Sequence, residues 1–444
     1  MDKEYLIKEK PLRALIVFAL PMIIGNLFQQ FYTMADSVVV GRYVSENALA
    51  AVGASYALTN VFICVAIGGG VGASVITSRY FGARDYSHMK KSIYTALISF
   101  LAVSVILAVA GLIFGRQLMK LLNTPENILD MTTLYLNIYF IGLPFLFMYN
   151  VLSAMFNALG RSRIPLVLLI FSSILNILLD VYMVRNLGLG IRGVAVATLI
   201  AQGISALISF IVFIKVIAQY KCKKTELFDA SELRHMAGIA LPSILQQSTV
   251  SIGMLLVQSV VNGFGTEMLA GYSAAMRIES ICVVPMAAMG NAVSSFTAQN
   301  IGAKRFDRVK QGYHISFGIV AFFAVIICAA LELFNKGIIS MFLDAKSTEL
   351  SINTGIGFLK FMGWFYAIIG FKMITDGLLR GAGDMKMFTV ANLANLSLRV
   401  IMAVTLAPRF GIEFIWYAVP LGWSANFIIS YTQYKTGKWR RLHE

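Results

Sequence analysis

Charged residues are scarce in this sequence. They make up 13% of the 444 residues, about half of the share that is typical of soluble domains. Apolar residues make up 58%, and the mean hydropathy is +0.75. Runs of eighteen or more mostly apolar residues recur along the chain, as in membrane-spanning helices, whereas the short alternation of outer-membrane barrel strands is lacking. The composition predicts an all-α polytopic membrane protein.

Cysteine and histidine are also rare, with four of each. The cysteines form no CxxC pair and the histidines have no metal-ligand spacing. A P-loop and a GxSxG motif are lacking too. We therefore expect no enzyme, no ATP-driven machine and no cofactor other than a coupling ion. The N-terminus has no apolar region followed by a cleavage site, so we expect no signal peptide.

Twelve membrane spans are predicted from the apolar runs, each long enough to cross a hydrocarbon core of about 30 Å. Their ranges are 13–38, 48–78, 92–114, 128–155, 164–185, 191–217, 236–262, 269–297, 313–334, 350–375, 387–407 and 411–434. The alternate loops that include both termini carry 25 of the 37 basic residues, and the opposite loops carry 8. By the positive-inside rule, both termini lie in the cytoplasm. Because the basic residues are spread over short loops, we expect no nucleic-acid partner.

The sequence repeats itself at a spacing of 220 or 221 residues. Ala-Leu-Pro at 19–21 recurs at 240–242, and Phe-Gly-Ala-Arg at 81–84 recurs as Ile-Gly-Ala-Lys at 301–304. Six spans separate the copies, so the two halves have the same orientation in the membrane. Transporters are commonly built from such repeats, with the substrate site near the midplane. We predict two six-helix lobes related by a pseudo-two-fold axis: an N-lobe at 1–218, a cytoplasmic linker at 219–235 and a C-lobe at 236–444.

Two carboxylates lie inside predicted spans of the first half and have no counterpart in the second. At the repeat spacing, Asp36 corresponds to Val257 and Asp180 to Ile401. A charged side chain within a membrane helix costs about 2.5–3.5 kcal/mol, so it indicates function by default. The alternative is that both carboxylates only pair with buried asparagine, tyrosine or arginine side chains.

Asn176 and Asp180 are four residues apart, and so they share one helical face. A second carboxylate, Asp36, and the hydroxyl of Thr198 would complete an oxygen-rich cluster. Such a cluster suits either a proton or a sodium ion, and no other metal is predicted. Two carboxylates cannot both ionise freely in a low dielectric, so protonation is feasible near neutral pH. For Asn176 and Thr198, local hydrogen bonding remains the alternative.

Other polar side chains in the first six spans suggest a wet cavity for small organic molecules. They are Gln29, Gln30, Tyr32, Tyr135, Tyr139, Asn150, Ser153 and Asn157. Each of them alone is more typical of an interhelical hydrogen bond than of a ligand contact. Pro21, which interrupts the hydrogen bonds of the first helix, is a candidate hinge fifteen residues before Asp36, although bent helices also serve packing alone.

The second half carries charges of both signs within its spans. We expect a charge network in the C-lobe that stabilises this half or takes part in transport. Its members are Arg277, Glu279, Lys360 and Arg399. Lys372 and Asp376, four residues apart, are expected to extend their charged ends towards the membrane surface.

These patterns together resemble the multidrug and toxic compound extrusion (MATE) family. The residues that carry the resemblance are Pro21-x14-Asp36-x4-Gly41, Asn176-x3-Asp180, Gly188-x-Gly190-x-x-Gly193, Ala197-Thr198, the segment 299–303 and the segment 379–384. The chain looks most similar to the prokaryotic DinF-type branch. The acidic pair that marks the seventh and tenth spans of NorM-type members is not seen.

The resemblance implies the MATE (MOP-superfamily) fold, with two lobes around a cleft that faces the two sides of the membrane alternately. Asp36 would be the cation-coupling carboxylate, with Asn176, Asp180 and Thr198 around it. Tyr135, Asn150 and Ser153 would belong to the N-lobe cavity. The protein would lie in the cytoplasmic membrane of a prokaryote, in contact with membrane lipid, and would function as a monomer.

The expected function is secondary active multidrug efflux, in which amphipathic or cationic organic compounds leave the cell in exchange for H⁺ or Na⁺. The sequence does not separate the two ions, because aspartate, asparagine and threonine oxygens serve both. One alternative is a lipid-linked oligosaccharide flippase of the same superfamily, which would need a strongly cationic groove. Another alternative is a membrane scaffold or sensor that transports nothing.

Overall fold

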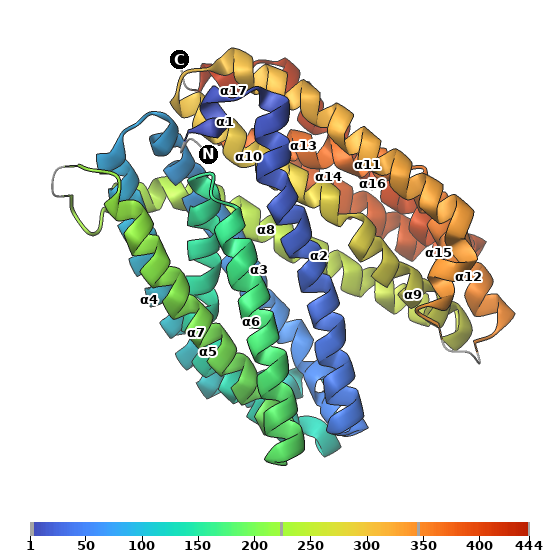
Figure 1. The fold of residues 1–444 in the computed structure, drawn as a ribbon. Coiled ribbons are helices and arrows are strands. Elements are labelled where there is room, and N and C mark those ends of the chain that lie inside the picture. The colour runs from blue at the N-terminus through green and yellow to red at the C-terminus, as the bar shows by residue number, and fades with distance from the viewer. Residues whose placement is uncertain (1–3, 223–224, 344–346, 443–444) are drawn as a thin grey trace. The chain divides into compact units, whose positions relative to one another are not determined.

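The chain is almost entirely helical in the computed structural model (Figure 1). The structure describes residues 4–222, 225–343 and 347–442, apart from the side chains at positions 35–42, 46 and 57. Within these residues, ten helical stretches are long and apolar enough to cross a membrane. A helix pair bent by 54°, α12 (Glu349–Gly363) and α13 (Tyr366–Ala382), forms an eleventh candidate span. The prediction of an all-α polytopic membrane protein is confirmed.

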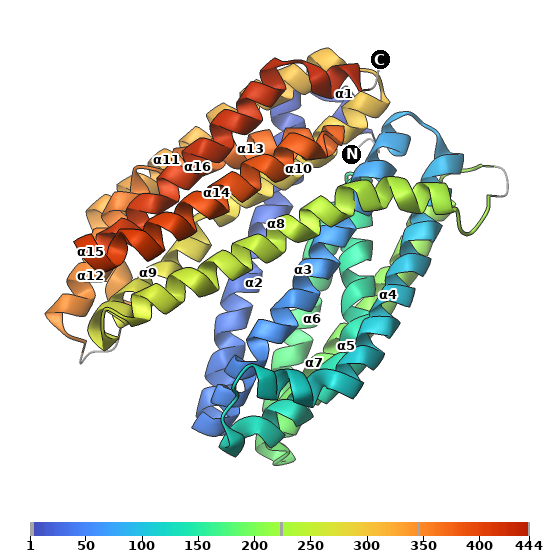
Figure 2. The ribbon, with the colours of Figure 1, turned by 180° about the vertical axis from the view of Figure 1, so that it is seen from behind.

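The helices divide into two compact units. Unit 1 comprises the described residues of Met1–Ile23 and Leu245–Glu444, and unit 2 comprises Ile24–Ile244. Two helices belong to both units, namely α2 (Pro11–Tyr43) and α8 (Ala230–Asn262). Each runs continuously through a proline, Pro21 or Pro242, close to the point where the unit changes (Figures 1 and 2). The predicted lobe boundaries at 218 and 236 stay a prediction.

Unit 2 consists of the later part of α2, the earlier part of α8 and the helices between them. These are α3 (Glu46–Gly82), α4 (Tyr86–Leu121), α5 (Glu126–Ala158), α6 (Arg163–Val181), the π-helical turn η1 (Tyr182–Asn186) and α7 (Gly190–Ala218). Helix α5 packs against α3, α4 and α7, and α6 packs against α7. The start of α3 is capped by the hydroxyl of Ser45, which accepts from the backbone N–H of Ala48 at 3.1 Å.

Unit 1 combines the N-terminal segment with the second half of the chain. Besides parts of α2 and α8 it contains α1 (Tyr5–Lys8), α9 (Thr266–Cys282), α10 (Val284–Gly302), α11 (Phe306–Ser340), the pair α12 and α13, α14 (Met385–Thr405), α15 (Ala407–Phe410), α16 (Glu413–Lys435) and α17 (Lys438–Arg441). Two predicted spans are broken, at 283 and at 364–365. Helix α16 coincides with the twelfth predicted span but is not among the helices apolar enough to count as one.

The internal repeat is visible in the local geometry. Arg84 and Lys304, at the predicted spacing of 220, both have left-handed backbone angles, with φ of 58° and 57°. Their N–H groups donate to the carbonyls of Phe81 (3.1 Å) and Ile301 (2.8 Å), so the two helix ends form the same turn. The packing also repeats, because α13 contacts α10, α11 and α16 as α5 contacts α3, α4 and α7.

Candidate functional site

Three helices of unit 2 bring predicted cation-coupling residues together. Asn176 and Asp180 lie one turn apart on α6 and are 2% and 0% exposed. The amide nitrogen of Asn176 lies 3.4 Å from the hydroxyl of Thr198 on α7. The hydroxyl of Tyr32 on α2 is hydrogen-bonded to the Asn176 amide. The predicted grouping of Asn176, Asp180 and Thr198 is therefore present, and Tyr32 is added to it.

The Asn176 amide can also face the other way, and its surroundings favour that orientation. When the amide is turned, its nitrogen donates to Asp180 Oδ2 at 3.2 Å, and its oxygen accepts from the backbone N–H of Thr198 at 3.2 Å. The orientation of a side-chain amide is assigned from such hydrogen bonds. Asn176 thus bridges the carboxyl group on α6 and the backbone of α7, which fixes the position of Asp180.

Asp36 belongs to α2, one helical turn after Tyr32. Its side chain lies outside the described residues, so the role predicted for it stays a prediction. Helices place residues four apart on the same face. The backbone therefore puts position 36 on the face of α2 from which Tyr32 reaches the Asn176 amide.

A small pocket with a cavity volume of about 10 Å³ lies between α5 and α7 of unit 2. Its lining residues are Tyr135, Ile138, Tyr139 and Gly142 from α5, and Ala195, Thr198, Leu199 and Gln202 from α7. A Cβ atom at Gly142 would lie only 3.2 Å from a Leu199 methyl group, so glycine leaves the gap between the helices open. Thr198 belongs both to the pocket wall and to the carboxylate cluster. The two predicted features, cavity and cation site, are thus adjacent.

The other polar residues predicted for the cavity on α5 do not join this pocket. Asn150 donates to the carbonyl of Leu146 in its own helix at 2.8 Å. Asn157 lies 22 residues after Tyr135, a distance of about 33 Å along an α-helix, and its buried side-chain oxygen has no hydrogen-bond partner among the described residues. These residues were predicted to lie together because they belong to one helix, but their positions are spread along its whole length.

The remaining predicted residues lie elsewhere in the units. Gln29 is exposed, Gln30 and Ser153 are half-buried, and Pro21 is buried inside the unbroken helix α2. Sequence analysis missed Gln202 as a pocket residue. Gln202 follows Thr198 by one helical turn on α7, and this spacing was the signal that could have found it.

Comparison with known families agrees with this arrangement. The MatE family model matches residues 21–182 and 242–405, which cover most of the chain and correspond to its two repeats. The chain belongs to the MatE family. The resemblance to the MATE family is confirmed, and so is the prediction that the chain is no enzyme, because the relatives and structural neighbours of this MatE protein are transporters. Placement in the DinF-type branch stays a prediction.

Individual relatives cover almost the whole of this MatE chain. The "Probable multidrug resistance protein YpnP" of Bacillus subtilis (strain 168) is 28% identical over 97% of this chain and 96% of its own length. The "FAD transporter" of Shewanella oneidensis is 24% identical, over 92% and 91% of the two chains. A crystal structure of MATE in the bent conformation matches with a TM-score of 0.90 and 23% identity, over 100% of this chain and 99% of that one. The MATE fold is therefore shown.

The predicted charge network in the second half of this MatE protein is only partly present. Arg277 is exposed and forms no ion pair with any described residue. Lys360 pairs with Glu332 at 3.5 Å, with its side chain 48% exposed. Glu279 and Arg399 interact electrostatically but are not within ion-pair distance of each other. The four residues do not form one connected set of ion pairs within the described structure.

The expectation that Lys372 and Asp376 extend towards the membrane surface is wrong. Their side chains are 4% and 3% exposed, and Lys372 Nζ lies 3.0 Å from Asp376 Oδ2. The ammonium also donates to Asn392 Oδ1 (3.2 Å), and Ser430 donates to Asp376 Oδ1 (2.9 Å). Polar side chains from α14 and α16 thus provide hydrogen bonds to Lys372 and Asp376 inside unit 1. These hydrogen bonds offset the cost of burying the two charges, so the side chains do not need to extend to the membrane surface.

Replacing Lys372 by Met is expected to lower the free energy of unfolding by about 3–5 kcal/mol. The substitution leaves the Asp376 carboxylate buried without its counter-charge. Unfolding of the purified protein in detergent measures the loss. K360M is the control, because its pair with Glu332 is partly exposed and should contribute about 1 kcal/mol or less.

The double variant K372M/D376L removes both charges and should recover most of the lost stability, since an apolar pair of similar volume is tolerated in place of a buried ion pair. Equal effects of K372M and K360M would contradict the assignment of Lys372 and Asp376 as a buried pair.

Proposed function

We propose that this protein is a cation-coupled antiporter that exports amphipathic, cationic organic compounds. The observation that carries the proposal is the position of Thr198, which lines the neutral pocket and also contacts Asn176 beside the buried Asp180. A ligand in the pocket and a cation at the carboxylate would then lie side by side. Such proximity lets each affect the binding of the other.

Coupling requires that cation and substrate bind with opposing preference, because a coupling free energy acts equally in both directions. Asp180, the Asn176 amide oxygen and the Thr198 hydroxyl supply hard oxygen ligands for Na⁺, and the same carboxylate can take up a proton. In the proposed cycle, cation uptake at Asp36 and Asp180 releases the substrate outside. Loss of the cation to the cytoplasm then restores affinity for the next substrate.

The chemistry of the pocket supports cationic and aromatic substrates. Tyr135 and Tyr139 offer aromatic faces to an organic cation. The cavity volume of about 10 Å³ has room for little more than one water molecule, and sites that hold drug-sized ligands have ~300–1,000 Å³. Substrate binding therefore requires α5 and α7 to separate further than they do here.

An anionic substrate is less compatible with this pocket. A flavin dinucleotide, as in the name of the Shewanella relative, or a lipid-linked pyrophosphate needs cationic donors near its phosphates. The eight residues that line the pocket are all neutral. We therefore favour organic cations over the flippase alternative, and the family's transport activity over a scaffold or sensor.

We propose that the protein acts as a monomer in the cytoplasmic membrane of a prokaryote, with both termini in the cytoplasm, as the excess of lysine and arginine in the corresponding loops supports. Membrane lipid and small organic substrates would be its partners, and no cofactor beyond the coupling ion is proposed.

The variant D36N tests whether the carboxylate on α2 takes part in cation coupling. Gradient-driven efflux of a fluorescent organic cation, measured as uptake into everted membrane vesicles, is expected to fall by about tenfold, which corresponds to 1.4 kcal/mol of lost coupling. Expression of the variant is checked in the same vesicles. Undiminished gradient-driven uptake would remove Asp36 from the coupling mechanism.

A further inference from the structure

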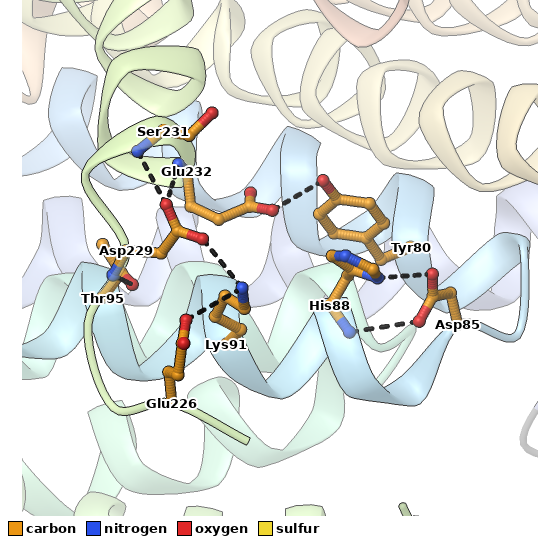
Figure 3. A network of polar contacts seen from close by, with 9 residues as sticks. All are labelled: Tyr80, Asp85, His88, Lys91, Thr95, Glu226, Asp229, Ser231 and Glu232. Carbon is orange, nitrogen blue, oxygen red and sulfur yellow. Dashed lines mark hydrogen bonds and ion pairs between the residues drawn. The ribbon is translucent and has the colours of Figure 1, made fainter. Parts of the chain in front are cut away.

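The segment 226–232, which joins the two halves, is bound to α4 by an ionic contact (Figure 3). Lys91 Nζ lies 2.8 Å from Asp229 Oδ2 and 3.2 Å from Glu226 Oε2. The side chains of Lys91 and Asp229 are 20% and 24% exposed, whereas Glu226 is 71% exposed. One lysine thus holds two carboxylates of the segment, in a partly sheltered position.

Asp229 also organises the start of α8 (Figure 3). Its Oδ1 accepts from the backbone N–H of Ser231 at 2.7 Å, and its own N–H donates to the hydroxyl of Thr95 on α4 at 3.0 Å. The hydrogen bond from Lys91 lowers the pKa of Asp229, so the carboxylate stays ionised at neutral pH. Loss of Lys91 would therefore weaken the contact that holds Asp229, the residue directly before α8, in place.

Beyond this contact, the first part of α8 lies directly on α3. Tyr80 donates to Glu232 Oε1 at 2.8 Å (Figure 3). A Cβ atom at Gly72 would lie 2.6 Å from the carbonyl oxygen of Met236, and one at Gly68 would lie 2.6 Å from the backbone of Ile244. Backbone approach this close requires the first part of α8 to be held firmly in place.

A corresponding segment, residues 5–9, precedes α2 and is bound within unit 1. Asn300 on α10 donates to the carbonyl of Leu6 at 3.1 Å, and Arg308 on α11 donates to the carbonyls of Leu6 (3.1 Å) and Glu9 (2.7 Å). Arg305 donates to the carbonyl of Ile7 at 2.9 Å. Each half of the sequence therefore begins with a segment that binds a helix pair assigned, by sequence, to the other half.

One contact position on α3 is related by the repeat to a contact position on α10. At the spacing of 220, Tyr80 corresponds to Asn300 and His88 to Arg308. His88, however, does not contact the segment 226–232. It contacts Asp85 at 2.7 Å, as Figure 3 shows. Equivalent positions in the two halves therefore contact the two segments, but the kinds of contact differ.

The two contacts differ in what holds them. Around residues 5–9, the donors bind backbone carbonyls, and Tyr5, Leu6 and Ile7 are buried, at 7%, 1% and 6% exposure. In the segment 226–232, the apolar side chains Leu227 and Phe228 are 65% and 47% exposed. Salt screens partly exposed ion pairs, whereas apolar burial is not weakened by such screening.

We propose that residues 226–232 are a releasable latch, which keeps the first part of α8 on α3 through Lys91, and that residues 5–9 are an anchor that opens only later. Opening of the latch frees the first part of α8 and is the earlier of the two events when the protein changes conformation. As a step in export this rests on the proposed function. The order of opening itself can be measured without substrate or ion gradient.

The test uses cysteine accessibility in the purified full-length protein. Met236 is 4% exposed, so M236C reports on the departure of α8 from α3. C222S removes the exposed cysteine of the linker, and C222S alone gives the background from the other three cysteines. In the C222S/M236C protein, K91M is expected to raise the maleimide labelling rate about fivefold, as the loss of a partly exposed ion-pair network implies.

K90M is the matched control, because Lys90 is the adjacent residue on α4 and forms no ion pair within the described structure. It should leave the labelling rate unchanged, and K91R, which keeps the positive charge, should label more slowly than K91M. At about 1 M salt, where the Debye length is about 3 Å, the parent C222S/M236C protein should approach the K91M rate. The reporter I7C in the anchor should not respond to salt.

Equal labelling of K91M and K90M would overturn the latch. If salt raises the labelling rate of I7C in the anchor as much as that of M236C at the latch, the proposed order of opening is wrong. If the latch opens as described while efflux shows no dependence on an ion gradient, the proposed function fails and the latch stands.

Discussion

Replacing Asp180 by Asn is expected to lower gradient-driven substrate transport by about tenfold or more, within the ~5–150-fold that coupling free energies of 1–3 kcal/mol correspond to. Asn keeps the shape and a hydrogen-bonding oxygen but can neither carry charge nor bind a proton at neutral pH. Because Asp180 is fully buried beside Asn176 and Thr198, its charge acts in a low dielectric, where its loss has a large effect.

The same substitution at a surface carboxylate of the same unit provides the control. Asp130 is 83% exposed and pairs with Arg116 at 2.8 Å. D130N should transport at the rate of the unmodified protein, because exposed ion pairs contribute little. Transport by D180N that equals transport by D130N would show that the buried carboxylate takes no part in coupling.

Replacing Gly377 by Ala is expected to destabilise the protein strongly. A Cβ atom there would lie 2.2 Å from the carbonyl oxygen of Gly290, and one at Gly381 would lie 2.3 Å from that of Ser294. Helices α13 and α10 therefore meet backbone to backbone, and the obstacle is not a flexible side chain. We expect G377A to lower the free energy of unfolding by about 3 kcal/mol or more, at the upper end of overpacking effects.

A glycine with open space around it gives the opposite expectation. A Cβ atom at Gly357 on α12 would meet nothing within 4 Å. G357A should therefore leave packing intact and raise the stability by about 0.5–1 kcal/mol, since alanine favours the helix. Unfolding of both variants in detergent compares them directly. If G377A is as stable as the unmodified protein, α13 and α10 are not packed as described.

The pattern of the sequence predicted the parts of the site that depend on one helix or on the repeat. Asn176 and Asp180 share a face because they are four residues apart, and the spacing of 220 gives the matched turns at Arg84 and Lys304. The partner Tyr32 was expected in the cavity and not at the Asn176 amide. The reason is that contacts between helices depend on rotation and depth, which periodicity does not specify.

The burial of Lys372 and Asp376 shows the same limit. Their spacing predicts that they can pair, but the depth of the pair is set by Asn392 and Ser430, which lie on other helices. The bent junction between α12 and α13 was not predicted either, because an uninterrupted apolar run reads as one span. Depth in the bundle is a property of the packed unit and not of any one segment.

In the linker, the repeat spacing predicted which positions correspond to each other, but it did not predict which groups those residues contact. The spacing identifies Tyr80 with Asn300, but one contacts a glutamate side chain and the other a backbone carbonyl. Only the packed structure distinguishes a segment held by charge from one held by buried apolar side chains.

The central claim is that the carboxylate cluster of unit 2 couples an ion gradient to the movement of organic cations. Flux of a fluorescent organic cation through the purified protein in proteoliposomes, with a pH gradient and a sodium gradient imposed separately, tests it most directly. We predict that one of the two gradients accelerates the flux of the unmodified protein and leaves that of D180N unchanged. Flux that is the same with and without both gradients would contradict the account.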